Sequence, residues 1–342
     1  MKLAPLALTL AASLGATLAA APAMAAPAYT LTKSVPLGAP DRWDYVVADP
    51  ETGRVYVAHG DKVAVLDGRS GELVGQVEGI PGGTHGIAVS HATGQGFTDD
   101  GGKGAAVAFD LKTLKVLKQI PADQDADAIA RDPVTGRVFV MEGDPGAITV
   151  IDPKTNQAVT SIKAGEKLEY AAADGEGFLY VAGEAKRDLL KIDARTNTIV
   201  ARWATPDCQS PHGLAVDAAS HRAFMGCINS VMMVVDTQSG RLVAKLPIGK
   251  GSDAIAWDAK RKRVFSPNGR DGTISVYQQV SPDRYDALET IQTQVTGRTM
   301  AVDPETGRLF VAAAEAGPPA QPGGRPRPVP GTFKLLILEP VK

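Results

Sequence analysis

Seven ionisable side chains recur at one position of an internal repeat, five residues ahead of a turn-forming segment. Carboxylates, imidazoles and a guanidinium can bind a cation, coordinate a divalent metal ion or move protons, provided that the fold gathers them. Their neighbours in the sequence are mostly small or apolar, so the polarity belongs to this position. The set, called the ring residues below, is Asp44, His85, Asp127, Glu169, His212, Asp253 and Arg298.

The turn-forming segment identifies the repeat that must position these residues. It reads Asp-Pro-Glu-Thr-Gly-Arg from Asp49, and close copies begin at Asp132 and Asp303. Seven copies follow one another at intervals of 41 to 45 residues, which is typical of a propeller blade. The weaker copies begin at Ser90, Asp174, Asp217 and Asp258.

Each copy predicts four short strands separated by tight turns. Asp and Pro favour the turn, and Gly or Asn supplies its left-handed residue. With 36 glycines and 24 prolines, the composition also suits many short strands. In the first copy we expect strands at Tyr45 to Ala48, Val55 to Ala58, Lys62 to Leu66 and Leu73 to Val77.

The sequence therefore predicts an all-β fold, a seven-bladed β-propeller with four-stranded blades, over residues 29–340. The last copy supplies three strands, ending in Phe333 to Leu338. Tyr29 to Val35 resembles the fourth strands of other copies, so we expect this N-terminal strand to close the last blade. Sharing one blade between distant segments leaves no exposed sheet edge in the ring.

In a propeller the innermost strands converge on the axis, so the ring residues should meet at the channel mouth. Crowded like charges raise some carboxylate pKa values unless a cation or Arg298 offsets them. An ion pair among Asp44, Asp253 and Arg298 is expected because their blades are adjacent around the closed ring. Two interpretations remain beside a ligand, divalent-metal or catalytic site: the ring is polar because the channel holds water, and His85 and His212 hydrogen-bond neighbouring blades.

A second tier of candidate residues lies ten positions after each turn start. We expect it to begin the loops on the same face and to widen the mouth into a polar funnel. Gly183, Cys227 and Ala313 also occupy this position, without such chemistry. The candidate ligand-binding members are His59, Asp100, Glu142 and Asn268.

The second strands carry a resemblance to a known family. Tyr56-Val57-Ala58-His59 and Tyr180-Val181-Ala182-Gly183, each after its turn, resemble the tetrapeptide of the YVTN-repeat β-propellers. The resemblance runs from about residue 41 to 340, and over this range the chain is similar to the secreted, YncE-like branch of the family. It implies a propeller fold, and it leaves function open, because the family includes binding proteins, surface-layer proteins and relatives of enzyme subunits.

Export is predicted from the first residues. Lys2, an apolar stretch and Ala23-Met24-Ala25 are typical of a cleaved signal peptide at 1–25, giving a periplasmic or secreted protein. In that compartment Cys208 and Cys227, the two cysteines of the chain, are expected to form a disulfide. A formal net charge of −2 predicts no general nucleic-acid binding, and no later segment predicts membrane insertion. We expect a monomer.

Residues 315–331 interrupt blade seven with a Pro- and Gly-rich loop on the mouth side. This density of Pro and Gly predicts an extended or mobile segment, either a tolerated insertion or a lid or partner-docking arm.

Motifs for haem attachment, zinc proteases, serine hydrolases and phosphate-binding loops are absent from the sequence, which weighs against an enzyme. We favour a scaffold that binds a small molecule or a protein at the mouth. The alternatives are a lactonase-type hydrolase using a divalent metal at the mouth, and an accessory subunit of a periplasmic redox enzyme.

Overall fold

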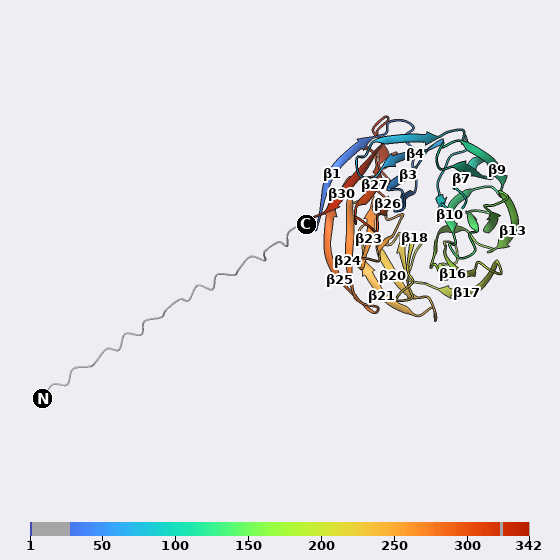
Figure 1. Cartoon of the computed structure of the whole chain (residues 1–342). Helices are drawn as coiled ribbons and strands as arrows, with labels where there is room; N and C mark the ends of the chain where they lie inside the picture. Colours follow the sequence, from blue (N-terminus) through green and yellow to red (C-terminus); the bar gives the residue numbers. More distant parts are fainter. Residues whose placement is uncertain (2–27, 322–323, 342) are drawn as a thin grey trace.

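The computed structural model describes residues 1, 28–321 and 324–341. Within them the chain forms seven four-stranded antiparallel sheets around a central axis (Figure 1), which confirms the predicted seven-bladed β-propeller. The proposed signal peptide lies, apart from Met1, outside the described residues. No helix in the described part of the chain is long and apolar enough to cross a bilayer.

The first four blades each consist of four consecutive strands. Blade one contains β2 (Val46–Asp49), β3 (Arg54–His59), β4 (Lys62–Asp67) and β5 (Leu73–Val77). Blade two contains β6 (Ile87–Ser90), β7 (Gln95–Asp100), the 3-10 turn η1 (Gly101–Lys103), β8 (Ala105–Asp110) and β9 (Val116–Pro121). Blade three contains β10 (Ala126–Arg131), β11 (Val138–Glu142), β12 (Ala147–Asp152) and β13 (Gln157–Lys163). Blade four contains β14 (Leu168–Ala173), β15 (Phe178–Gly183), β16 (Asp188–Asp193) and β17 (Thr198–Ala204).

Blades five and six follow the same order, and blade seven combines both ends of the domain. Blade five contains β18 (Pro211–Asp217), β19 (Arg222–Cys227), β20 (Val231–Asp236) and β21 (Leu242–Pro247). Blade six contains β22 (Ala256–Asp258), β23 (Arg263–Asn268), β24 (Thr273–Ser281) and β25 (Arg284–Gln292). Blade seven contains β26 (Thr299–Val302), β27 (Leu309–Ala313), β30 (Lys334–Pro340) and β1 (Tyr29–Pro36), and a short pair, β28 (Ala316–Gly317) and β29 (Arg327–Pro328), interrupts it.

The closing strand behaves as the sequence predicts. β1 pairs with β30 in antiparallel register from Tyr29 opposite Pro340 to Pro36 opposite Lys334. The order β1-β30-β27-β26 makes β1 the outermost strand of blade seven. The innermost strands β2, β6, β10, β14, β18, β22 and β26 contact one another in sequence, and β26 contacts β2, so the ring is closed.

The turns that define the repeat are held by their own side chains. Asp132 accepts hydrogen bonds from the backbone N–H and the hydroxyl of Thr135, at 2.7 and 2.6 Å. Gly53, Gly136 and Gly307 close the three strongest copies with φ near +70°, at 71°, 74° and 77°. A residue with a side chain would be strained at this φ, which accounts for the glycine in these three copies.

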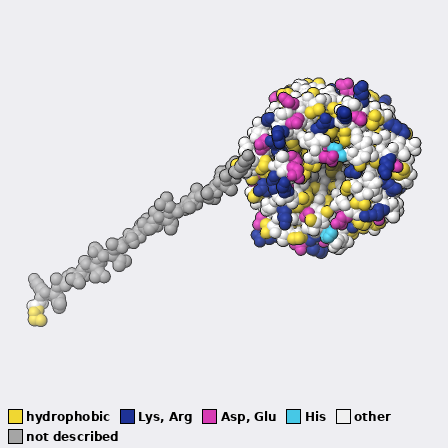
Figure 2. All heavy atoms as spheres, viewed as in Figure 1, with side chains coloured by type: hydrophobic (Ala, Val, Ile, Leu, Met, Phe, Trp, Pro, Cys, Tyr) yellow, Lys and Arg dark blue, Asp and Glu magenta, His cyan; other side chains and the backbone are white. Residues whose placement is uncertain are grey.

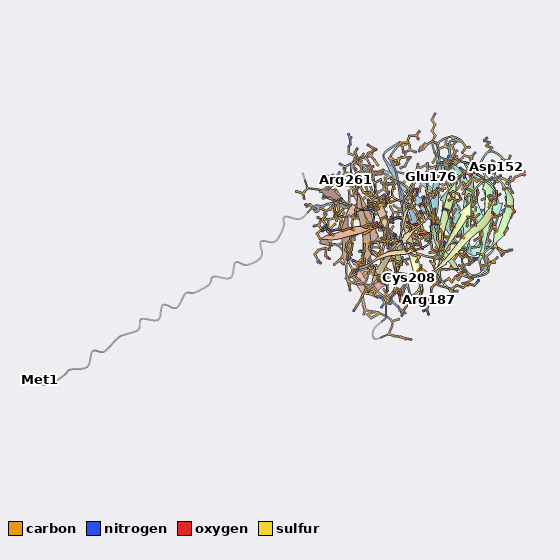
Figure 3. The ribbon with its side chains drawn as sticks, turned by 90° about the horizontal axis from the view of Figure 1, so that it is seen from below. Met1, Asp152, Glu176, Arg187, Cys208 and Arg261 are labelled. Atoms are coloured by element: carbon orange, nitrogen blue, oxygen red, sulfur yellow. A yellow bond between two sulfur atoms is a disulfide. The ribbon has the colours of Figure 1, made fainter. Side chains whose placement is uncertain are left out.

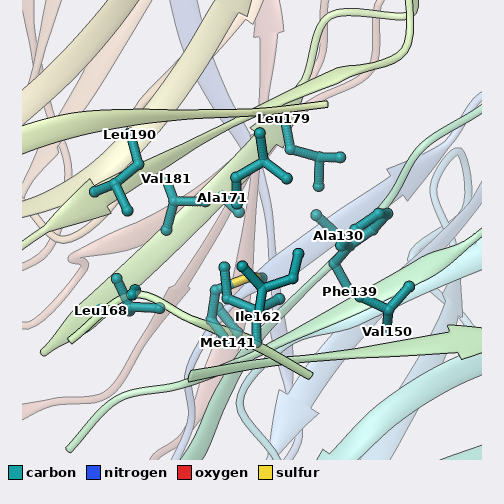
Figure 4. Close-up of a cluster of buried hydrophobic side chains, with 14 of the residues drawn as sticks. Ala130, Phe139, Met141, Val150, Ile162, Leu168, Ala171, Leu179, Val181 and Leu190 are labelled. Carbon is teal, nitrogen blue, oxygen red and sulfur yellow. The ribbon is translucent and has the colours of Figure 1, made fainter. Parts of the chain in front are cut away.

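The hydrophobic core lies between the blades rather than in one central mass. Apolar side chains from the facing surfaces of blades three and four interdigitate, including Phe139, Met141, Leu179 and Val181 (Figure 4). Similar clusters fill the other interfaces. Because burial of apolar surface is the main driving force for folding, each blade depends on its neighbours. This apolar packing between neighbouring blades fixes the positions at which the inner strands end.

The two ends of the blades carry different loops. In Figure 3, Arg187 and Cys208 lie toward one end, and the turn residues Glu176 and Arg261 lie toward the other. Charged side chains of both signs are interspersed over the face seen in Figure 2.

Candidate functional site

The structure brings the ring residues to one end of the channel, which we call the mouth. The expected ion pair forms between Arg298 Nε and Asp253, at 2.6 Å. Arg298 also donates to the backbone carbonyl of Trp43 at 3.1 Å, which ties blade seven to the segment leading into blade one. His212 Nε2 lies 3.8 Å from the other oxygen of Asp253. Side chains of blades five, six and seven thus meet at the axis.

His85 is oriented by a carboxylate that the sequence analysis did not single out. Its Nδ1 lies 2.6 Å from Asp99 Oδ2, and Asp99 is fully buried. The other oxygen of Asp99 accepts the backbone N–H groups of His85 and Gly86, at 2.9 and 2.7 Å. Nε2 of His85 lies 3.0 Å from the guanidinium of Arg42. The imidazole is therefore held in one orientation, with Nδ1 toward Asp99 and Nε2 toward Arg42.

Two carboxylates lie beside His85 and have no such support. One ligand atom each of Asp44, His85 and Asp127 lies within 4.8 Å of the other two. Among the described residues neither carboxylate accepts a hydrogen bond or forms an ion pair within 4.0 Å. Their neighbours on blades one to three therefore leave both with open lone pairs.

The opposite side of the mouth holds a second group. Ligand atoms of Glu169, Glu184 and His212 also lie within 4.8 Å of one another. Here Lys167 already supplies a cation, at 3.5 Å from Glu169 and 2.8 Å from Glu184. The Ser210 hydroxyl donates to Glu184, and His212 Nδ1 lies 2.7 Å from the Ser210 carbonyl. Both carboxylates of this group thus already have a cationic neighbour in Lys167.

Tyr45, which the sequence analysis treated only as a strand residue, forms the floor of the mouth. It is 6% exposed, and its ring lies against Tyr170 with centroids 4.4 Å apart. Tyr170 also lines a cavity at the far end of the inner strands, with Val89, Ala130 and Trp257. The two aromatic rings thus lie between the mouth and that cavity. In the sequence, the available signal for this role of Tyr45 was that it directly follows the ring residue Asp44.

Burial shifts the protonation of three ring carboxylates. Burial, partly offset by the charge of Arg298, raises the pKa of Asp44 to about 7. Burial raises the pKa of Asp127 to about 6 despite His85. Burial and the charge of Asp127 raise the pKa of Glu169 to about 9. Near neutral pH the mouth therefore holds protons that a bound cation would displace.

The other groups of the mouth respond to their partners. Burial opposes the charge of Asp253, but the charges of Arg298, His212 and Arg325 and the hydrogen bond from Arg298 together outweigh it and lower the pKa of that carboxyl. Burial disfavours the charged imidazole of His85, but the hydrogen bond and charge of Asp99 prevail and raise its pKa to about 9. Burial, with the charge of Asp44 and of other ring carboxylates, raises the pKa of Tyr45 well above its usual range, so its hydroxyl remains a donor.

The second tier lies elsewhere than expected and corrects the funnel hypothesis. His59, Asp100, Glu142 and Asn268 are all fully buried, so these four side chains do not line the mouth. They hold backbone and neighbouring strands: Asp100 accepts from Gly82 N–H at 2.6 Å, and Glu142 accepts from Asp123 N–H at 2.9 Å. His59 Nε2 lies 2.7 Å from the Pro40 carbonyl, and Asn268 donates to Ser275 at 3.0 Å. We do not include these four residues in the candidate site.

The predicted disulfide is present. Cys208, in the loop before β18, is bonded to Cys227 at the end of β19, with Cα atoms 5.2 Å apart. Both cysteines are buried, and the bridge fixes the loop that leads to Ser210 and His212. It therefore supports one side of the mouth.

The described part of the blade-seven loop, residues 315–321 and 324–331, lies beside the mouth. Arg325, Pro326 and Pro328 line a small cavity together with Trp43, His212, Ile228, Gly251, Ser252, Asp253, Gly269, Arg270, Thr296 and Arg298. Most of the loop is irregular, apart from the two-residue pairing of β28 with β29. Its return is anchored where both oxygens of Asp41 accept Gly331 N–H, at 2.7 and 2.8 Å.

The comparisons with known proteins support the fold and do not identify a function. No protein-family model matches the sequence, and no curated protein matches it. Among solved structures, a chain of the mitotic checkpoint complex matches with a TM-score of 0.74 and 16% identity, over 98% of this chain and 99% of that one. A chain of Kuenenia stuttgartiensis hydrazine synthase matches with a TM-score of 0.69 and 13% identity, over 81% of this chain and 93% of that one. At such identities the likeness shows a shared propeller fold alone.

Proposed function

We propose that this chain is an exported, YncE-like YVTN-repeat propeller that binds a positively charged ligand at the mouth. The repeat spelling supports the family, and the signal-like N-terminus and the disulfide support an oxidising compartment. A binding scaffold is consistent with a closed propeller, in which rigid blades hold loops and side chains in fixed positions.

One observation carries the ligand class. After Arg298 is paired with Asp253 and Lys167 with Glu184, the carboxylates of Asp44 and Asp127 still accept no hydrogen bond and form no ion pair within 4.0 Å among the described residues. One ligand atom of each lies within 4.8 Å of the other and of His85. Bringing a cation to such a group relieves repulsion between partly buried like charges, so binding is favoured by the arrangement itself.

The test uses simple cations as probes. Calcium, manganese and zinc chlorides, putrescine and arginine methyl ester are titrated by calorimetry into the wild type near pH 8 at low salt. The ring variant is Asp44→Asn/Asp127→Asn. The control, Glu51→Gln/Glu305→Gln, removes carboxylates that are 67% exposed in the repeat turns.

We expect saturable binding of at least one probe to the wild type and the control, and none to the ring variant. Equal binding to the ring variant, or no saturable binding of any probe to the wild type, would refute the proposal. The salt dependence should be modest, because the groups are partly buried and poorly screened.

A second candidate function is favoured by the two clusters that combine carboxylates with histidine. Such donors can hold a divalent ion that activates water, as a lactonase-type hydrolase requires. Hydrolysis of a small lactone, followed by pH-stat with and without manganese or zinc, tests it. Activity that disappears in the ring variant and survives in the control would replace simple binding with catalysis.

A further inference from the structure

We infer that Asp44, His85 and Asp127 form a site for one divalent ion of the manganese or zinc type. The inference rests on the proposed function, because it assigns the cation of the mouth to a metal and places it on blades one to three. The nearby group of Glu169, Glu184 and His212 is excluded from this assignment.

The donor set and its spacing are the first support. Two carboxylates and one imidazole, with ligand atoms within 4.8 Å of one another, converge from three consecutive blades. Metal–oxygen and metal–nitrogen bonds of about 2.0–2.2 Å require these atoms to approach by small side-chain rotations. Mixed oxygen and nitrogen donors suit manganese or zinc better than calcium, which prefers oxygen alone.

The surroundings of His85 are the second support. A metal-bound histidine commonly donates its other ring N–H to a carboxylate, which fixes the tautomer and the ring plane. Asp99 has that position: it is fully buried, lies 2.6 Å from Nδ1 and is itself held by two backbone N–H groups. Nε2 is thereby left as the ligand atom.

The unsatisfied groups around the site are the third support. No side chain in the described ranges hydrogen-bonds to the Asp44 or Asp127 carboxylate, whereas Lys167 already bridges the alternative cluster. Tyr45 is 6% exposed, and its hydroxyl has no hydrogen-bond partner among the described residues. That hydroxyl lies close enough to the ring for the charges of Asp44, Asp253, Glu169 and Asp127 to act on it. It can donate to a water or anion that the ion holds.

Arg42 gives the inference a distinctive consequence. Its exposed guanidinium lies 3.0 Å from His85 Nε2, the atom assigned to the metal. The guanidinium and the ion compete for the same atom, and the like charges also repel. Removing Arg42 should therefore tighten metal binding, although the substitution removes a polar side chain from the mouth. A purely electrostatic attraction to the ring would give tightening for every cation probe.

The experiment compares manganese and zinc affinities of the full exported protein by calorimetry, with metal content per chain measured after dialysis. We expect one ion per chain. Asp44→Asn/Asp127→Asn should weaken binding by about 100-fold or more, and Asp99→Asn by about 10–100-fold. Glu169→Gln/Glu184→Gln, the matched control, should change it less than about threefold, and Arg42→Ala should tighten it.

A spectroscopic readout tests the ligand itself. Pulsed electron paramagnetic resonance of bound manganese should show nitrogen coupling, and His85→Gln should abolish it. Circular dichroism and urea midpoints identify any variant that has simply lost its fold. If His85→Gln fails to fold, the metal affinity of the Asp44→Asn/Asp127→Asn variant decides instead.

The outcomes separate this inference from the proposed function. Binding of putrescine or arginine methyl ester without any metal would leave the proposed function standing and overturn the metal site. Metal binding that the Glu169→Gln/Glu184→Gln variant loses, or that carries no nitrogen coupling, would also overturn it. Absence of binding by every cation would refute both.

Discussion

Substitution of Glu169 by Gln tests whether the mouth is as desolvated as the structure indicates. Glu169 is 7% exposed, and burial with the charge of Asp127 raises its pKa from 4.5 to about 9. Between these values the folded protein keeps a proton that the unfolded chain has released. The free energy of unfolding contributed by this group therefore falls as pH rises through that window.

The magnitude follows from the shift. From about pH 5.5 to about pH 8 the contribution falls by about 3 kcal/mol, at 1.36 kcal/mol per pH unit. Gln cannot ionise and resembles the protonated carboxyl in shape. The stability advantage of the variant over the wild type should therefore grow by about 3 kcal/mol between pH 5.5 and pH 8. Loss of the 3.5 Å contact with the half-exposed Lys167 subtracts a few tenths to about 1 kcal/mol.

The assay is urea unfolding followed by tryptophan fluorescence, at several pH values and constant ionic strength, without metal. Glu305→Gln, which neutralises a 67% exposed carboxylate, serves as the control and should show no pH-dependent gain. A difference between Glu169→Gln and wild type that stays constant from pH 5.5 to 8 would refute the reasoning. It would mean that Glu169 ionises normally and that the mouth is well hydrated.

Three further predictions concern the frame around the mouth. Replacing Cys208 and Cys227 by Ala together opens a loop with a sequence separation of 19 and should lower stability by about 3 kcal/mol, measured as a urea midpoint; an unchanged midpoint would deny the bridge a stabilising role. Gly213→Ala places a Cβ 2.3 Å from the Ala254 carbonyl carbon on the next blade and should cost about 2 kcal/mol or more, so a stable variant would contradict the close approach of these strands. Asp41→Ala removes the acceptor of Gly331 N–H and should speed proteinase K cleavage within residues 315–331; equal cleavage of the wild type would show that the anchor does not restrain the loop.

Much of the fold was predictable because each turn is specified locally. The first-copy strands expected at residues 55–58 and 73–77 correspond to β3 (Arg54–His59) and β5 (Leu73–Val77). The closing strand was predictable from its likeness to other fourth strands and from the missing partner in blade seven. The ring residues could be counted out because each lies five positions ahead of the start of its turn.

The partners of the ring residues were harder to predict because they depend on register and on contacts between blades. Asp99 and Asp100 adjoin in β7, yet one orients His85 and the other accepts Gly82 N–H. Since successive strand residues point to opposite faces, a count that is off by one selects the wrong partner. The same limit explains the second tier: polarity at a strand end does not distinguish a channel lining from a buried hydrogen bond. Tyr45 has an ordinary core pattern, and only the tertiary structure directs its hydroxyl to the axis.

The pairing of β1 with β30 has a consequence for how the ring assembles. It joins Tyr29 to Pro340, whereas the other strand pairs of the blades join neighbouring segments of the chain. Closing a loop of about 300 residues costs about 3 kcal/mol more chain entropy than closing a hairpin of about ten. The local hairpins should therefore form first, and this pairing should come last in folding and open first under stress. The mouth, which needs Arg298 of blade seven beside Asp253 of blade six, would gain its final geometry only at that last step.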